Sequence, residues 1–242
     1  MRSILLLIIL NLLMPHTAWS LDLKKLVRKV EEQYMGLSSK SRMSMNIRSA
    51  HWERSLTMDA WSVGRDHFLV KIIEPAKERD VATLKVDKEV WNYLPKVNRV
   101  IKVPPSMMGG AWMGSHITND DLVKANKIEE DYSFALIEET PQHYLIECIP
   151  KPDAAVVWGK IVYEILRPRE VPGTVAYFDE EMIKVRDMIF SDVTEIDGRT
   201  IPLKMTIQPV DTPEERTLIH YTDIDFDIGI GTDFFSLRNL KR

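Results

Sequence analysis

Acidic residues alternate with apolar ones near the C-terminus, where the sequence from Asp223 reads DIDFDIG. Carboxylates at this spacing could supply oxygen ligands to calcium. An EF-hand loop, however, needs glycine at its sixth position and glutamate at its twelfth, and the sixth position here is Ile228. The alternation is typical of a strand with one solvated acidic face. We therefore expect a strand here and no metal site.

Other residues suited to acid–base or nucleophilic chemistry are scattered. Asp179, Glu180 and Glu181 could act as paired carboxylates, but a charged turn between two strands explains them equally well. Cys148 is the one cysteine and has no base beside it, which predicts a buried, inert thiol and no internal disulfide. Histidines after residue 20 show neither metal-ligand spacing nor a nucleophile-elbow serine: His51, His67, His116, His143 and His220. We expect that the protein is not an enzyme.

Composition argues against nucleic-acid and cofactor binding. The chain has 32 Lys and Arg against 36 Asp and Glu, a net charge of −4. Binding to phosphate backbones depends on clustered basic residues, which are lacking here. The glycines at positions 109, 110 and 114 do not follow a strand in the dinucleotide-binding pattern. We expect no nucleic-acid partner and no cofactor.

The first twenty residues have the pattern of a secretory signal peptide. Arg2 precedes an apolar run at positions 4–13, and the small-residue pattern AWS follows at 18–20. The run is shorter than the roughly twenty residues that span a bilayer. The residue directly after the expected cleavage near Ser20 is Leu21 and not the cysteine that would carry a lipid. The mature chain from Leu21 should therefore be soluble and without a lipid anchor. Residues 21–242 contain no linker and should form a single domain.

A segment from Trp91 to Lys124 combines strand-like and loop-like patterns. Two alternating runs lead through Pro104 and Pro105 into a glycine-punctuated loop. This loop carries four large apolar side chains: Met107, Met108, Trp112 and Met113. Surface loops are normally polar, so these side chains need an apolar surface to cover.

Two interpretations of this loop remain open from the residues alone. It could be a compact plug whose Met and Trp side chains are ordinary core. It could instead be a movable lid over an apolar cavity, with unbranched Met adapting to ligands of varying shape. His116 directly follows the loop and is the histidine of most interest.

The periodicity of the remaining chain predicts a mainly β fold. Asp22 can cap a helix with an apolar stripe from Leu23 to Tyr34, and Gly36 lies where that helix would end. Thr118 can cap a second short helix through Lys124. Apolar alternation elsewhere predicts about a dozen strands in an antiparallel meander. The expected strands lie at 43–47, 56–60, 68–72, 81–86, 89–94, 99–103, 132–137, 144–149, 160–166, 174–178, 183–193, 201–207 and 217–228. Such a meander closes into a barrel or curves around its covers, with a concave apolar face.

The stretch WNYLPKVNRVIKVPPSMMGGAWMGSHITNDDL resembles the segment that marks the outer-membrane lipoprotein-sorting protein family, relatives of the LolA and LolB carriers. In that family an aromatic-x-Tyr-Leu-Pro run leads into a loop rich in Ser, Gly and Met and then into an Asp-Leu helix start. The GTDFFSL run at 231–237 resembles the family's closing helix turn. The other strands match only in pattern.

This resemblance implies a half-open antiparallel β-barrel, covered by helices and a lid loop, that carries lipoprotein acyl chains or another lipid through the periplasm. It favours the lid over the plug, with an inner-membrane lipid transporter and an outer-membrane acceptor as possible partners. A basic residue on an early strand latches the lid in such carriers, and Arg48 or Arg54 could serve. The expected lipid-binding and lid residues are Trp91, Tyr93, Met107, Met108, Trp112 and Met113. The expected lid hinge comprises Pro104, Pro105, Gly109, Gly110 and Gly114. The alternative function is that of a non-carrier interaction module of an envelope lipid transporter.

Overall fold

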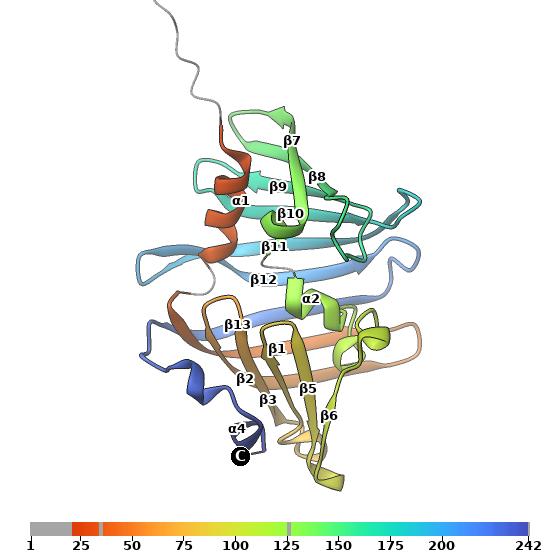
Figure 1. Ribbon diagram of the computed structural model, residues 1–242, viewed down its shortest axis with the longest axis vertical. Coiled ribbons are helices and arrows are strands. Elements are labelled where there is room, and N and C mark those ends of the chain that lie inside the picture. The colour runs from red at the N-terminus through yellow and green to blue at the C-terminus, as the bar shows by residue number, and fades with distance from the viewer. Residues whose placement is uncertain (1–20, 34–35, 125–126, 242) are drawn as a thin grey trace, which may run out of the picture.

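The computed structural model describes residues 21–33, 36–124 and 127–241. Within them, thirteen strands form one antiparallel sheet in the order β6-β5-β4-β3-β2-β1-β13-β12-β11-β10-β9-β8-β7. The two edge strands do not pair with each other, so the strongly curved sheet is a half-open barrel (Figure 1). This confirms the expected fold class. The twenty residues of the expected signal peptide and Tyr34 lie outside the described residues.

The elements follow in chain order. The first half contains α1 (Leu23–Glu32), β1 (Ser38–Arg48), β2 (Glu53–Val63), β3 (His67–Glu74), β4 (Ala82–Val86), β5 (Glu89–Leu94) and β6 (Arg99–Lys102). Short helices come next: η3 (Pro105–Met107), η4 (Trp112–Gly114), α2 (Asn119–Lys124) and α3 (Ile128–Asp131). The second half contains β7 (Tyr132–Glu139), β8 (His143–Pro150), β9 (Lys160–Leu166), β10 (Val171–Phe178), β11 (Lys184–Ile196), β12 (Arg199–Pro209) and β13 (Arg216–Phe226). The chain closes with η5 (Thr232–Phe234) and α4 (Leu237–Leu240).

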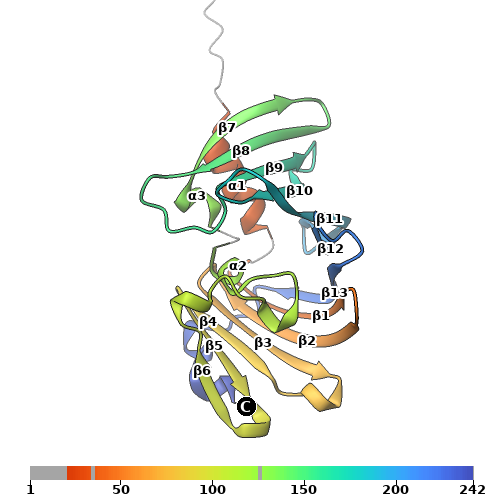
Figure 2. The same ribbon diagram turned by 90° about the vertical axis from the view of Figure 1, so that its right-hand side faces the viewer.

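The chain enters this sheet in the middle and not at an edge. Strands β1 to β6 run outward to one edge, and β7 begins at the opposite edge, from which the meander returns to β13 beside β1. Residues 103–131 must therefore pass from one edge of the sheet to the other. Figure 2 shows α1, α2 and α3 on the inner side of the curved sheet. The loop rich in Met and Gly is the first part of this crossing segment.

Local sequence explains where the first helix begins and where the last strand ends. Asp22 caps α1 by accepting a hydrogen bond from the backbone N–H of Lys25 at 3.0 Å, as expected. The helix ends at Glu32, ahead of the expected Gly36. Strand β13 ends at Phe226, two residues before the expected boundary, because Asp227 adopts a left-handed conformation (φ 54°). Its carboxylate accepts a hydrogen bond from the backbone N–H of Leu37 at 2.7 Å, which joins the two chain segments.

Apolar side chains form two cores, one on each face of the sheet. The larger core lies on the concave face and contains fully buried residues from both halves, including Met45, Met58, Ile146 and Ile207. The smaller core lies on the convex face, where the C-terminal segment covers β3, β4 and β5. It contains Leu69, Leu84, Tyr93, Phe235 and Leu240. Strands β3 to β5 thus bury both of their faces.

A buried ion pair holds the crossing segment against the second half of the sheet. Arg186 of β11 donates to Asp121 Oδ1 at 2.7 Å and to the carbonyl oxygen of His116 at 2.8 Å. Its guanidinium lies 4.5 Å from the ring centres of both Trp158 and Tyr177. The side chains of Arg186 and Asp121 are 5% and 7% exposed. Asp121 also completes the expected helix cap, because Thr118 and Asp121 exchange side-chain and backbone hydrogen bonds.

We predict that Asp121→Asn destabilises the protein by about 3–5 kcal/mol, because it leaves the Arg186 charge buried without its partner. The neighbouring Asp120→Asn is the matched control. Burial raises the pKa of Asp120, so the folded state already disfavours its charge and the loss should be small. Urea unfolding of both variants measures the difference. Equal midpoints for the two variants would contradict the structural role given to this pair.

Candidate functional site

A cavity of about 240 Å³ lies between the concave face of the sheet and the crossing segment. Its walls come from both halves of the sheet and from α1, α2 and α3. Apolar side chains dominate the lining, among them Met43, Phe68, Ile117, Leu122, Met188 and Ile219. An apolar cavity of about 150 Å³ in another protein stays dry and binds benzene. The space here is therefore suited to an apolar guest such as part of an acyl chain.

Trp112 is the part of the Met-rich loop that closes this cavity. Its side chain is 3% exposed, lines the cavity and donates from Nε1 to Thr83 Oγ1 of β4 at 3.0 Å. Left-handed conformations at Met113 (φ 51°) and Gly114 (φ 72°) turn the chain directly after it. Glycine adopts this conformation readily, whereas it is strained for methionine. The sharp turn allows the tryptophan to point inward from an otherwise exposed loop.

The three methionines of the loop contribute less to the cavity than expected. Met107 is 63% exposed, and Met108 is half-buried. Met113 is half-buried and packs against the concave core. The cavity lining includes none of the three. Instead, Ile117 and Leu122, which follow the loop, complete the cover.

Trp91 and Tyr93 lie on the other face of the sheet. Tyr93 belongs to the convex core, and Trp91 packs beside it with Lys102 Nζ 5.6 Å from its ring centre. The alternation of β5 places both side chains under the C-terminal segment, near Phe235. The sequence shows that one face of each strand is apolar, but when both faces are covered it does not tell which of them is concave.

The residues expected to form the hinge differ in their backbone requirements. Pro104 and Pro105 start η3. A Cβ at Gly109 would meet nothing within 4 Å, whereas one at Gly110 would lie 3.1 Å from the carbonyl oxygen of Met107. Gly114 is the position where a left-handed conformation requires glycine.

Arg54 holds the loop to the first half of the sheet. It extends from β2 and donates from Nη1 to the carbonyl oxygen of Met113 at 2.6 Å, while the same guanidinium pairs with Glu78. Arg48, the other candidate, pairs with Glu53 on the surface and is 49% exposed. Of the two, Arg54 has the contact that a latch requires.

His116 attaches the loop to the centre of the sheet. Its backbone N–H donates to Thr217 Oγ1 of β13 at 3.0 Å, and its Nδ1 lies 2.9 Å from the same oxygen. Its Nε2 lies 3.2 Å from Glu215 Oε2. The crossing segment is thus tied to β2, β4, β11 and β13 by polar contacts around its apolar underside.

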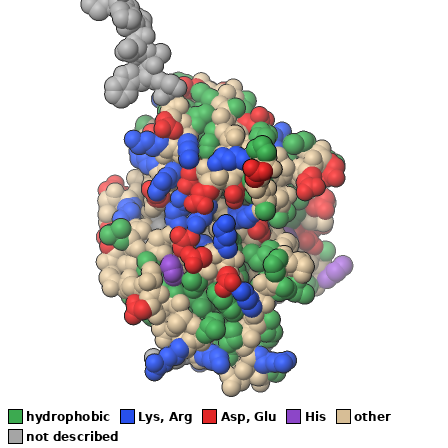
Figure 3. All heavy atoms as spheres, viewed as in Figure 1, with side chains coloured by type: hydrophobic (Ala, Val, Ile, Leu, Met, Phe, Trp, Pro, Cys, Tyr) green, Lys and Arg blue, Asp and Glu red, His purple; other side chains and the backbone are tan. Residues whose placement is uncertain are grey.

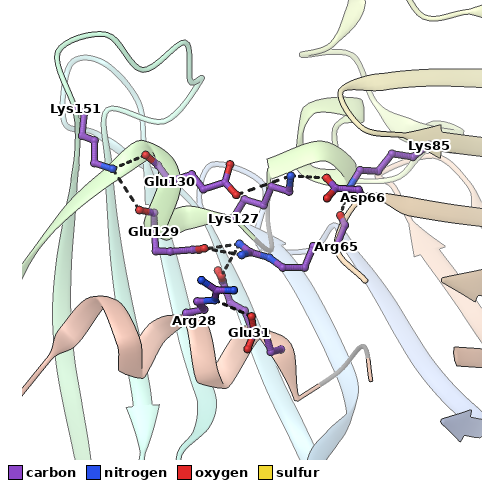
Figure 4. A network of polar contacts seen from close by, with 10 residues as sticks. Arg28, Glu31, Arg65, Asp66, Lys85, Lys127, Glu129, Glu130 and Lys151 are labelled. Atoms are coloured by element: carbon purple, nitrogen blue, oxygen red, sulfur yellow. Dashed lines mark hydrogen bonds and ion pairs between the residues drawn. The ribbon is translucent and has the colours of Figure 1, made fainter. Parts of the chain in front are cut away.

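A cluster of charged residues lies beside the cavity, around the turn between β2 and β3 (Figure 4). Arg65, in the turn between β2 and β3, forms two hydrogen bonds with the Glu129 carboxylate of α3, at 2.6 and 2.8 Å. Lys127 pairs with Asp66 of the same turn. Figure 3 shows basic and acidic side chains interspersed over the middle of this face. These ion pairs join the turn between β2 and β3 to the end of the crossing segment.

Two buried titratable groups lie beside this cluster. Burial, reinforced by the nearby Glu129, raises the pKa of Glu31 well above its ordinary value. Burial also lowers the pKa of Lys85 to about 8, and the positive charge of Lys127 acts in the same direction. Sequence reasoning missed Lys85, Glu31 and Arg186 as important residues. The sequence did contain a signal for Lys85, because it is a charged residue within the otherwise uncharged strand β4.

The cavity lining contains neither Cys148 nor the acidic run Asp179, Glu180 and Glu181. Cys148 is buried, and burial raises the pKa of its thiol. Among the described residues, no group of three or more His, Cys, Asp or Glu side chains could hold a metal ion. Within the same part of the chain, no helix is long and apolar enough to cross a membrane.

Comparisons with known proteins agree on the fold. The chain resembles a crystal structure of an outer membrane lipoprotein-sorting protein domain from Vibrio parahaemolyticus, with a TM-score of 0.80 at 21% identity over 90% of this chain and 98% of that one. A DUF1329 family protein from Desulfovibrio piger matches with a TM-score of 0.82 at 19% identity, over 90% and 97% of the two chains. A LolA superfamily protein from Nitrosomonas europaea matches with a TM-score of 0.75 at 18% identity, over 89% and 98%.

Comparisons of sequence find one family model and no curated protein. No curated protein matches the chain. A family model described as an uncharacterized protein matches residues 64–242, which include β3 to β13 and the whole crossing segment. The chain belongs to this family, and its fold is that of the LolA-like outer-membrane lipoprotein-sorting proteins.

Proposed function

We propose that residues 21–242 form a periplasmic carrier domain that binds lipoprotein acyl chains or another lipid and transfers it toward the outer membrane. The supporting observation is the apolar cavity, which is closed by a segment running from one free edge of the sheet to the other. The solved structures of similar fold include a lipoprotein-sorting domain. The signal peptide would be cleaved near Ser20 during export, and an inner-membrane transporter and an outer-membrane acceptor would be the partners.

Energetics are consistent with this role. Each methylene removed from water contributes about 0.8 kcal/mol, so roughly ten buried methylenes would contribute about 8 kcal/mol before ordering costs. Binding of this strength requires a means of release. The cavity of about 240 Å³ is small for a complete lipid, so we expect the crossing segment to move as a larger cargo enters or leaves. In this proposal Trp112 and the Met side chains of the loop form the lid, and Arg54 latches it.

An exposed apolar strip favours the second candidate, a docking module of an envelope transporter. Val97 in the turn between β5 and β6, Ile101 of β6 and Met107 of η3 are 60%, 46% and 63% exposed near the β6 edge of the sheet. Such a strip can bind a protein partner without any bound lipid. Because a carrier must also meet a donor and an acceptor, the strip fits both candidates, and lipid binding distinguishes them.

A large side chain placed inside the cavity should weaken lipid binding. Ser41 of β1 is buried and lines the cavity, whereas Ser44 lies on the opposite face of the same strand. We predict that Ser41→Phe weakens binding of a fluorescent fatty acid at least about tenfold, since losing only two buried methylenes would have that effect. Ser44→Phe should bind as the wild type does.

Overpacking at Ser41 costs about 1–3 kcal/mol, so the melting temperature of both variants is measured in parallel. A folded Ser41→Phe protein that retains wild-type affinity would contradict lipid binding in this cavity.

Release of the latch should change kinetics more than affinity. We predict that Arg54→Met accelerates exchange of bound fluorescent fatty acid several-fold in stopped-flow displacement, because it removes the hydrogen bond to the Met113 carbonyl oxygen. Arg48→Met, which removes the same charge from the surface pair with Glu53, is the control. A fixed plug predicts a lower melting temperature for Arg54→Met with an unchanged exchange rate.

A further inference from the structure

Lys85 occupies an unusual position for a lysine. It lies on the inward face of β4 with Thr83, opposite Phe68 of β3, and both Lys85 and Phe68 line the apolar cavity. The residue is 4% exposed. Lysine is almost never fully buried unless it is paired. A buried lysine in a cavity wall thus needs an explanation.

The hydrogen bonds of Lys85 are incomplete. Its Nζ donates to the backbone carbonyl oxygen of Arg65 at 2.5 Å. An ammonium group has three N–H donors. Among the described residues, no side-chain carboxylate forms a hydrogen bond or ion pair with it. Two donors therefore remain for a ligand at the cavity wall.

Carboxylates near Lys85 already have other basic partners. The Glu129 carboxylate is bound by Arg65, and Asp66 by Lys127. Glu31 also lines the cavity, but its raised pKa favours the neutral acid. Asp66 and Asp87 attract the Lys85 charge, whereas Lys127 and Arg65 repel it.

A second hollow adjoins this end of the cavity and is open to solvent. It has a volume of about 570 Å³ and shares Gly64 and Arg65 with the apolar cavity. Charged residues of both signs line it: Arg28, Lys127 and Arg199, and Glu32, Asp66 and Glu130. An amphiphile could enter with its chain toward Trp112 and its head toward this polar hollow. Lys85 lines the apolar cavity, beside the charged cluster that borders the polar hollow (Figure 4).

We propose that Lys85 binds the carboxylate of a fatty acid whose chain occupies the apolar cavity. The inference rests on the lipid-binding function proposed above and specifies its ligand class: a single acyl chain with one negative charge. A head group with one negative charge matches the single ammonium group. Its carboxylate can accept hydrogen bonds from the two remaining N–H groups of Lys85. With a pKa of about 8, Lys85 is mostly protonated at neutral pH, as this pairing requires.

The test compares decanoic acid with decanol, which have the same chain length and differ in charge. Displacement of a neutral fluorescent probe at pH 7 is measured for the wild type, Lys85→Met and Lys88→Met. Lys88 lies in the adjacent turn and is exposed, so it controls for loss of one positive charge. The wild type and Lys88→Met should bind decanoic acid at least about tenfold more tightly than decanol, the factor expected for one charge-assisted hydrogen bond. Lys85→Met should lose this preference and retain decanol binding, which also shows that the variant is folded.

Retention of the full acid preference by Lys85→Met would overturn the assignment of Lys85 and leave the carrier function intact. Equal binding of decanoic acid and decanol by the wild type would also overturn the assignment of Lys85 and leave the carrier function intact. If neither compound displaces the probe from the wild type, the proposed lipid binding itself is wrong, and the inference about Lys85 fails with it.

Discussion

The order of the strands is the constraint on which the rest of this structure depends. Because β1 starts beside β13 in the middle of the sheet, β6 and β7 end at opposite edges, and residues 103–131 must connect them across the concave face. This connection prevents the concave face from being an open groove. It also makes the cover part of the main chain, held at both ends by the sheet that it covers. In the proposed carrier, this cover moves to release cargo and remains attached to the protein.

Polar contacts around the cover are arranged at its margins, and apolar contacts lie beneath it. Arg54 and Arg186, both on the sheet, bind backbone carbonyl oxygens and Asp121 of the crossing segment. His116 of that segment binds Thr217 of β13. Buried ion pairs contribute little net stability, but breaking one costs several kcal/mol because a charge is left unpaired. Such contacts favour one closed arrangement over many partly open ones. Opening must then exchange them for contacts with water or with a partner.

Periodicity alone was sufficient to predict most of the sheet, because period-two alternation reports directly on one buried face. It could not distinguish the concave from the convex face. For this reason Trp91 and Tyr93, expected at the lipid site, lie in the convex core under the C-terminal segment. Trp112 was identified because a large apolar side chain in a glycine-rich loop needs a cover. Lys85 and Arg186 were missed, since their roles depend on contacts between strands far apart in sequence.

Native mass spectrometry of the protein, purified without detergent from the envelope of its own cells, tests the central claim most directly. A carrier should emerge partly as a complex with a lipid, and mild collisional activation should release a species whose mass identifies the acyl chain. Substitution of Ser41 by Phe should remove that species. Recovery of the lipid-free chain bound to a protein partner would contradict the account and favour a docking module.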